Sequence, residues 1–258
     1  MFGFLIKKAF FDMWDHFLGI VIMNLGYVAV VTVPILLSGP ALQLGVLPFF
    51  LTVGVGIILF FLYSGAVAMA TREIANYQGP EFKKFFSYFK QTWRQSLMIG
   101  LIYCAVALVT QIGIPVYAGM GNLLGFTAII FLGWAIIIWL LASQFYLPIR
   151  AQLDTSVRKI IRKSFVIFFD NTFFAILVGI GSLLISVGSI FTALLIPGFA
   201  GLMLWHQVAL KLRLYKYDYL EENPDANRRK IPWDALLIDD EDRVGKRTLR
   251  GMIFPWKE

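Results

Sequence analysis

Long apolar stretches separated by short polar segments dominate the chain. A helix needs about 20 apolar residues to cross a bilayer, and Gly188 with Pro197-Gly198 divides the last, overlong stretch into two helices with a tight turn between them. The predicted spans are residues 17–37, 46–70, 97–117, 124–147, 172–188 and 191–210. The uninterrupted apolar runs exclude alternating barrel strands. We therefore expect an all-α polytopic membrane protein with six transmembrane helices arranged as three hairpins.

The positions of lysine and arginine predict the orientation. All 23 of these residues lie before the first span, in the second-to-third and fourth-to-fifth connections, or after the sixth span, and the turns at 38–45, 118–123 and 188–196 carry no charge. Because lysine and arginine collect on the cytoplasmic side, we expect both termini inside, in the inner (cytoplasmic) membrane of the cell. Residues 1–215 then form a membrane domain, and 216–258 a cytoplasmic tail. The end of the tail, Met252 to Trp256, is expected to anchor on the protein's own cytoplasmic surface, on the membrane interface or on a partner.

Composition narrows the class of protein. The chain is 59% hydrophobic and 15% charged, with a mean hydropathy of +0.73, which excludes an ordinary soluble domain. Cys104 is the single cysteine, so no disulfide framework is expected, and two histidines are too few for a histidine metal centre. No hydrolase, metalloprotease or nucleotide-binding motif is present. We expect no enzymatic activity, no cofactor, no metal and no nucleic-acid partner.

A basic and aromatic motif precedes the first, third and fifth spans. The three copies read Ile6-Lys7-Lys8-Ala9-Phe10, Phe82-Lys83-Lys84-Phe85-Phe86 and Ile161-Arg162-Lys163-Ser164-Phe165. Apolar residues continue at helical spacing after each copy, which predicts a cytoplasmic amphipathic helix ahead of every hairpin. Either the protein consists of three repeated units, or membrane-proximal basic helices converged on this composition.

These helices are expected to meet the anionic headgroups of the cytoplasmic leaflet. The candidate lipid-interface residues are Lys7, Lys8, Lys83, Lys84, Arg162, Lys163, Phe86, Phe89 and Trp93.

The spans contain no ionisable residue at their centres, whereas transporters and channels usually carry some. Gln111 and Gln144 are the candidates for a polar interior. The other polar side chains, such as Asn24 and Gln207, are expected to join helices through hydrogen bonds, and His206 is expected to be an ordinary histidine near a helix end.

Short motifs in the membrane region resemble the YesL-type family of bacterial membrane proteins. They are Asn24-Leu25, the run Pro34-Ile35-Leu36-Leu37-Ser38-Gly39-Pro40-Ala41, Phe86 with Phe89, and Tyr146-Leu147-Pro148. The resemblance covers residues 15 to 210. The chain differs from the family in two respects. It has an extra apolar stretch between Gly39 and Arg72, so that Ser64-Gly65-Ala66 is an alternative counterpart of the family's Gly-Pro-Ala, and it has a long C-terminal tail.

The resemblance implies an accessory role beside carbohydrate-uptake systems and transfers no catalytic residue. The leading hypothesis is a non-enzymatic accessory or interaction protein with a membrane-complex partner, linked to carbohydrate or solute uptake. The alternatives are a small-solute transporter or channel, and a lipid-binding membrane protein.

Overall fold

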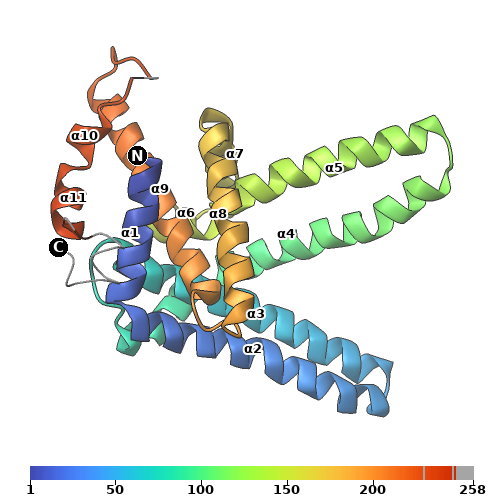
Figure 1. The fold of residues 1–258 in the computed structure, drawn as a ribbon. Helices are drawn as coiled ribbons and strands as arrows, with labels where there is room; N and C mark the ends of the chain where they lie inside the picture. The colour runs from blue at the N-terminus through green and yellow to red at the C-terminus, as the bar shows by residue number, and fades with distance from the viewer. Residues whose placement is uncertain (229, 246, 248–258) are drawn as a thin grey trace.

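The structure, a computed structural model, describes residues 1–228, 230–245 and 247, which form helices with no strand among them (Figure 1). After α1 (Phe2–Asp15), the chain forms a long helix pair, α2 (Phe17–Leu44) and α3 (Val46–Ala75). Gly45 joins these two helices with a φ of 133°, a conformation that favours glycine because it has no Cβ. The expected turn at 38–45 is therefore reduced to one residue, and α2 continues through Pro40.

The second helix pair is formed by α4 (Phe85–Gly119) and α5 (Leu123–Ser143), preceded by the short 3₁₀ helix η1 (Phe82–Lys84). The Asn122 side chain accepts a hydrogen bond from the Gly125 amide at 2.9 Å and caps the start of α5. A separate short helix, α6 (Tyr146–Gln152), follows α5.

The third part of the chain comprises α7 (Val157–Asp170), α8 (Thr172–Phe191) and α9 (Gly198–Glu222). The helix breaks between α1 and α2 at His16 and between α7 and α8 at Asn171 are similar, with φ, ψ of −114°, 30° and −138°, 44°. The second copy of the motif lacks such a break, because it runs from η1 directly into α4. Two of the three copies thus form separate helices.

Five helical segments are long and apolar enough to cross a membrane. They are Phe17–Leu44, Val46–Ala75, Phe82–Gly119, Leu123–Gln152 and Thr172–Phe191. They correspond to the first five predicted spans.

The sixth predicted span, 191–210, is not confirmed. Helix α9 begins only at Gly198, and its apolar part, 198–210, would extend about 20 Å at about 1.5 Å per residue. The hydrocarbon core of a bilayer is about 30 Å thick. Helix α9 is instead surrounded by protein, since it packs against α1, α2, α3, α6 and α8, and every residue from Leu204 to Leu210 is buried.

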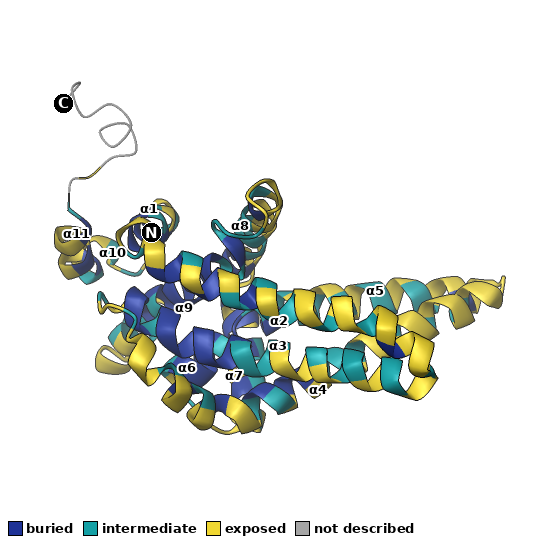
Figure 2. Ribbon diagram, turned by 90° about the horizontal axis from the view of Figure 1, so that it is seen from below, coloured by how far each residue is buried: buried dark blue, intermediate teal, exposed yellow. Residues whose placement is uncertain are grey.

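The helix pairs α2–α3 and α4–α5 project from a base that contains α1, α6, α7, α8 and α9 (Figure 1). Figure 2 shows buried residues concentrated in this base and exposed residues along the projecting helices. The exposed residues of the projecting helices are large and apolar, including Leu36, Leu47 and Phe131. Extended apolar surfaces of this kind mark contact with a membrane or a partner, so the projecting pairs fit a lipid environment.

The C-terminal helices α10 (Trp233–Leu236) and α11 (Ile238–Val244) dock on the base beside α1. Lys7 Nζ donates to the Gly245 carbonyl at 2.8 Å, and Arg247 pairs with Asp15 at 2.8 Å. The described part of the tail therefore docks on the chain itself. The expected anchor, Met252 to Trp256, lies outside the described residues.

Candidate functional site

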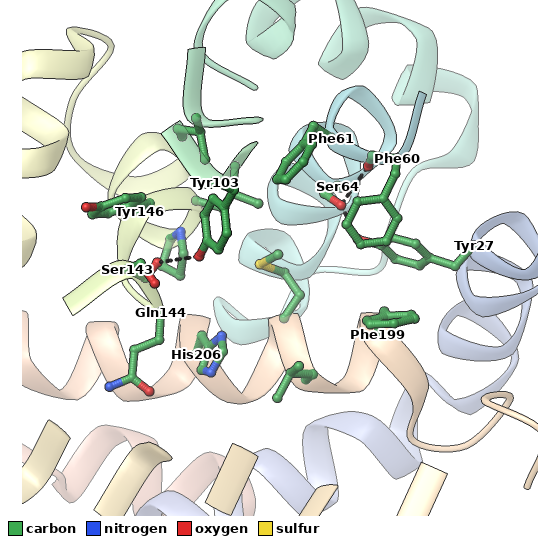
Figure 3. A pocket seen from close by; sticks show the side chains of 15 residues that line it. Tyr27, Phe60, Phe61, Ser64, Tyr103, Ser143, Gln144, Tyr146, Phe199 and His206 are labelled. Atoms are coloured by element: carbon green, nitrogen blue, oxygen red, sulfur yellow. Dashed lines mark hydrogen bonds between the residues drawn. The ribbon is translucent and has the colours of Figure 1, made fainter. Parts of the chain in front are cut away.

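A cavity of about 220 Å³ lies where the helix pairs meet the base (Figure 3). Residues of α2, α3, α4, α6 and α9 and of the α5–α6 junction form its walls. The lining residues are Tyr27, Phe60, Phe61, Ser64, Ile99, Tyr103, Ser143, Gln144, Tyr146, Leu147, Pro148, Phe199, Leu202, Met203 and His206.

On one wall, a tyrosine hydroxyl is held inside an aromatic surface. Tyr27 donates to Ser64 Oγ at 3.1 Å, and Ser64 donates to the Phe60 carbonyl one helical turn earlier at 2.8 Å (Figure 3). Ser64 can accept from Tyr27 because its own proton is directed to its helix backbone. The Tyr27 ring also packs against Phe60 and Phe199, with ring centroids 5.7 and 5.2 Å apart. Tyr27 is therefore fixed on this wall.

The opposite wall lies where α5 ends. Tyr103 of α4 directs its hydroxyl at the Ser143 carbonyl, 3.5 Å away, and its ring packs edge-on against Trp139 at 4.6 Å. Because the chain leaves α5 after Ser143, this carbonyl is one of the terminal acceptors that a helix leaves free. Gln144 donates to the Ala175 carbonyl at 3.0 Å and connects this wall to α8.

His206 contributes an imidazole, and its geometry argues against a nucleophilic site. Its Nε2 lies 2.7 Å from Ser182 Oγ, while Ser182 donates to the Val178 carbonyl at 2.8 Å. With the serine proton committed to Val178, the imidazole is the donor to Ser182. A nucleophilic serine must instead donate to the histidine that acts as its base. The Ser182–His206 pair therefore joins α8 to α9.

A second, larger cavity of about 440 Å³ adjoins the first between α5 and α8. The two cavities share Tyr103, Ser143, Gln144 and His206. The second is also lined by Leu140 and Leu183, whose exposed fractions are 52% and 68%. It therefore reaches the apolar surface of the molecule, and the shared side chains lie where the two cavities adjoin.

The chemistry of the two cavities is uniform. Their lining residues are apolar, aromatic, hydroxyl, amide or imidazole residues, with no Asp, Glu, Lys or Arg. Within the described residues, no group of three or more His, Cys, Asp or Glu side chains is placed to hold a metal ion. A cavity of this kind suits a neutral molecule that is largely apolar and carries a few polar atoms.

The structure separates the two glutamines that were expected in a polar interior. Gln144 lines both cavities, whereas Gln111 is an exposed residue of the projecting part of α4 and lines neither. The sequence pattern identified Gln111 only by its place in an apolar span. Its neighbour Ile112 is 62% exposed, which shows that this part of α4 faces outward.

Most of the predicted lipid-interface residues lie on the surface. Phe89 and Lys7 are half-buried, and Lys7 is engaged with the tail. The exposed members are Lys83, Lys84, Arg162, Lys163, Phe86 and Trp93.

Lys8 differs from the expectation, because it is fully buried. Its Nζ pairs with Asp12 at 2.8 Å and lies 3.5 Å from the centre of the Tyr77 ring. Burial lowers the pKa of Lys8 and raises the pKa of Asp12 to about 6. The face of α1 that carries Lys8 packs into the base, so Lys8 cannot reach a lipid headgroup.

Sequence reasoning assigned none of the cavity tyrosines, Tyr27, Tyr103 and Tyr146, to a site; Tyr146 was named only within the Tyr146-Leu147-Pro148 motif. Tyrosine counts as hydrophobic in a search for spans, so the signal that marks these residues is a hydroxyl inside an apolar helix. Asn24, in contrast, was expected to join helices. Its amide donates to the Leu195 and Pro197 carbonyls at 2.9 and 2.7 Å, and it accepts from the Ala200 amide at 2.8 Å. It thereby holds the start of α9.

Comparison with known proteins gives one relative. Over 131 residues the chain is 28% identical to "Uncharacterized protein YesL" of Bacillus subtilis (strain 168), and the match covers 49% of this chain and 61% of that protein. The chain thus spans less than two thirds of the length of the relative it matches. No family model matches, and no solved structure matches. The chain is thus similar to YesL. This similarity and the five long apolar helices both fit an integral membrane protein.

Proposed function

We propose that this chain is a multi-pass inner-membrane protein without enzymatic activity that binds a neutral, lipid-like molecule in the cavity between its helix pairs. The observation that carries the proposal is the pair of adjoining, uncharged cavities, the outer of which reaches the apolar surface. A molecule dissolved in the bilayer can enter such a site sideways, without crossing water. The hydroxyls of Tyr27 and Tyr103 and the amide of Gln144 then orient its polar atoms.

The cavity favours lipid binding over transport of a polar solute. A solute pathway needs polar groups along the length of the spans. Here the cavity where the helix pairs meet the base holds the polar lining groups, and Gln111 lies elsewhere on an exposed surface. Flux of a broad solute panel into reconstituted vesicles that fails on Gln144→Leu would favour the transporter instead.

A cavity-filling variant tests the proposal. Met203 lines the inner cavity, so Met203→Trp should occupy the space that the ligand needs. Leu108→Trp is the matched control, because Leu108 is 60% exposed on α4. Native mass spectrometry of protein purified in mild detergent should show a bound small molecule in the parent protein and in Leu108→Trp. Met203→Trp should lose it while keeping its thermal midpoint.

Absence of any bound molecule from the parent protein would overturn the proposal. Equal occupancy in a folded Met203→Trp protein would overturn it as well.

A second role is that of an accessory protein in a membrane complex, and the exposed surface around the base favours it. The docked tail and the exposed basic residues Lys83, Lys84, Arg162 and Lys163 offer a contact surface for anionic lipid and for a partner. The resemblance to the YesL-type family suggests a solute-uptake system as that partner. Co-purification from native membranes should recover a stoichiometric partner, and recovery of the chain alone at every detergent strength would contradict this role.

A further inference from the structure

Two arginines meet at the end of α3 and in α6. Arg72, in the last turn of α3, donates from Nη1 to the carbonyl of Ala151 at 2.9 Å. Ala151 follows Arg150 directly, and the positive charges of Arg72 and Arg150 repel each other. Like charges side by side in a partly buried place are unfavourable unless something offsets them.

Arg150 is the deeper of the two. Its exposed fraction is 8%, its Nη2 donates to the Gln91 carbonyl of α4, and its Nε is buried without a hydrogen-bond partner. A buried guanidinium donor that lacks an acceptor carries a desolvation cost. Arg72 is only half-buried, so a ligand would approach the pair from the Arg72 side.

No carboxylate neutralises this pair within the described residues. Of the acidic neighbours in sequence, Asp154 pairs with Lys163 at 3.1 Å. Glu73 accepts from the Tyr88 hydroxyl through Oε1, and its Oε2 is buried without a hydrogen bond to either arginine. Among the other buried cations, Lys8 has Asp12 at 2.8 Å and Lys216 has Asp170 at 2.7 Å. Buried Arg213 has no paired carboxylate in the described part of the chain, but it donates to Asn171 at 3.2 Å and lies 3.7 Å from the centre of the Phe174 ring.

Helix capping explains only half of the arrangement. Arg72 donates to a carbonyl in the last turn of α6, where a cation is favoured by the helix dipole. That interaction leaves Arg150 unexplained, because its partner Gln91 lies within α4 and its Nε has none.

We propose that Arg72 and Arg150 form a binding site for a phosphate group. Planar guanidinium groups bind phosphate through paired N–H donors, and two of them offset the single negative charge of a phosphodiester or the charge of up to two on a free phosphate. The site lies at the end of α3 where the charged connection begins, which is where a lipid headgroup would lie. The phosphate belongs to an anionic lipid or is free in solution. Neither arginine lines the cavities, so the site is separate from the lipid-like ligand proposed above.

The test compares the full chain with Arg72→Gln and Arg150→Gln, and uses Arg94→Gln as the control, since Arg94 is an exposed residue of α4. One arm measures binding of radiolabelled inorganic phosphate to the detergent-solubilised protein. The other measures, by native mass spectrometry, retention of phosphatidylglycerol against a galactolipid that has no phosphate. Each arginine supplies a charge-assisted interaction, so each Gln variant should weaken binding by about tenfold or more.

Dependence on both arginines in the first arm identifies free phosphate, and in the second arm a lipid headgroup. Either result supports the site. If neither probe binds the parent protein, or if the Gln variants bind as Arg94→Gln does, the proposal is wrong. Arg72→Gln can still donate to Ala151, so it carries the test if Arg150→Gln does not fold.

Discussion

At the scale of single residues, Gly198 shows how closely α9 is fitted to the base. Its φ is +62°, and a Cβ there would lie 2.4 Å from Asn24 Cγ. Gly198→Ala should cost at least about 2 kcal/mol, from left-handed backbone and from displaced Asn24 hydrogen bonds. Thermal unfolding in detergent measures the loss. Gly188→Ala is the control, because no atom lies within 4 Å of its Cβ position. Equal stability of the two variants would show that the close fit between Gly198 and Asn24 does not contribute to stability.

The buried Lys8–Asp12 pair predicts a pH dependence. Burial raises the pKa of Asp12 to about 6, above its usual value of about 4. The folded state therefore holds this proton more tightly than the unfolded chain, and the resulting stability is complete below about pH 4 and is lost as the pH rises to about 6.

The comparison is with Asp12→Asn, which stays neutral throughout. The thermal midpoint of the parent protein should fall relative to that of Asp12→Asn between pH 4 and 6. A constant difference would show that Asp12 does not titrate there.

At the residue scale, a single sequence does not identify the tertiary partners of a polar side chain. Asn24 is recognisable as a polar residue in a span, but its partners lie more than 170 residues away. Lys8 and Lys7 are equivalent in the repeated motif, and only the packing of α1 decides that one is buried and the other reaches the tail.

At the scale of elements, the docking of α11 depends on one carboxylate. Asp240 is buried, lies 3.4 Å from Lys211 Nζ and accepts from the Tyr215 hydroxyl at 3.1 Å. Asp240→Ala should leave the Tyr215 hydroxyl without its acceptor and Lys211 with only the Ala75 carbonyl at 3.1 Å. Amide hydrogen exchange in residues 238–244 should then rise by about tenfold or more. Asp239→Ala, an exposed neighbour, is the control. Equal exchange in the two variants would show that the Asp240 carboxylate does not hold α11 in place.

The elements also divide by how readily the sequence predicts them. Five spans follow from apolar length, because lipid demands a long uncharged helix. The position of α9 does not follow, since a helix buried in protein and a helix buried in lipid have similar apolar faces. The cavity is less accessible still, because it depends on how five helices pack.

At the scale of the whole molecule, contact between the ends of the chain bears on topology. The tail touches α1 through Lys7 with Gly245 and through Asp15 with Arg247. If α2 to α8 cross the membrane five times, the tail can meet α1 only if α9, which the other helices enclose, returns the chain through the interior of the protein. We therefore expect both described ends on the cytoplasmic side.

Cysteine labelling tests this arrangement in a Cys104→Ala background. A membrane-impermeant maleimide applied to intact spheroplasts should label Gly121→Cys and Thr192→Cys. It should label Asp225→Cys only after the membrane has been permeabilised. Labelling of Asp225→Cys from outside would mean that α9 does not return the chain.

Because the cavity between α5 and α8 reaches the apolar surface, the ligand concentration that matters for binding is the concentration in the bilayer. If the ligand enters from the bilayer, the concentration that governs occupancy is its mole fraction among the lipids. A weak intrinsic affinity would then suffice for a compound that partitions strongly into membranes. Dilution with inert lipid at constant total ligand should empty the site, whereas dilution with buffer should leave it filled.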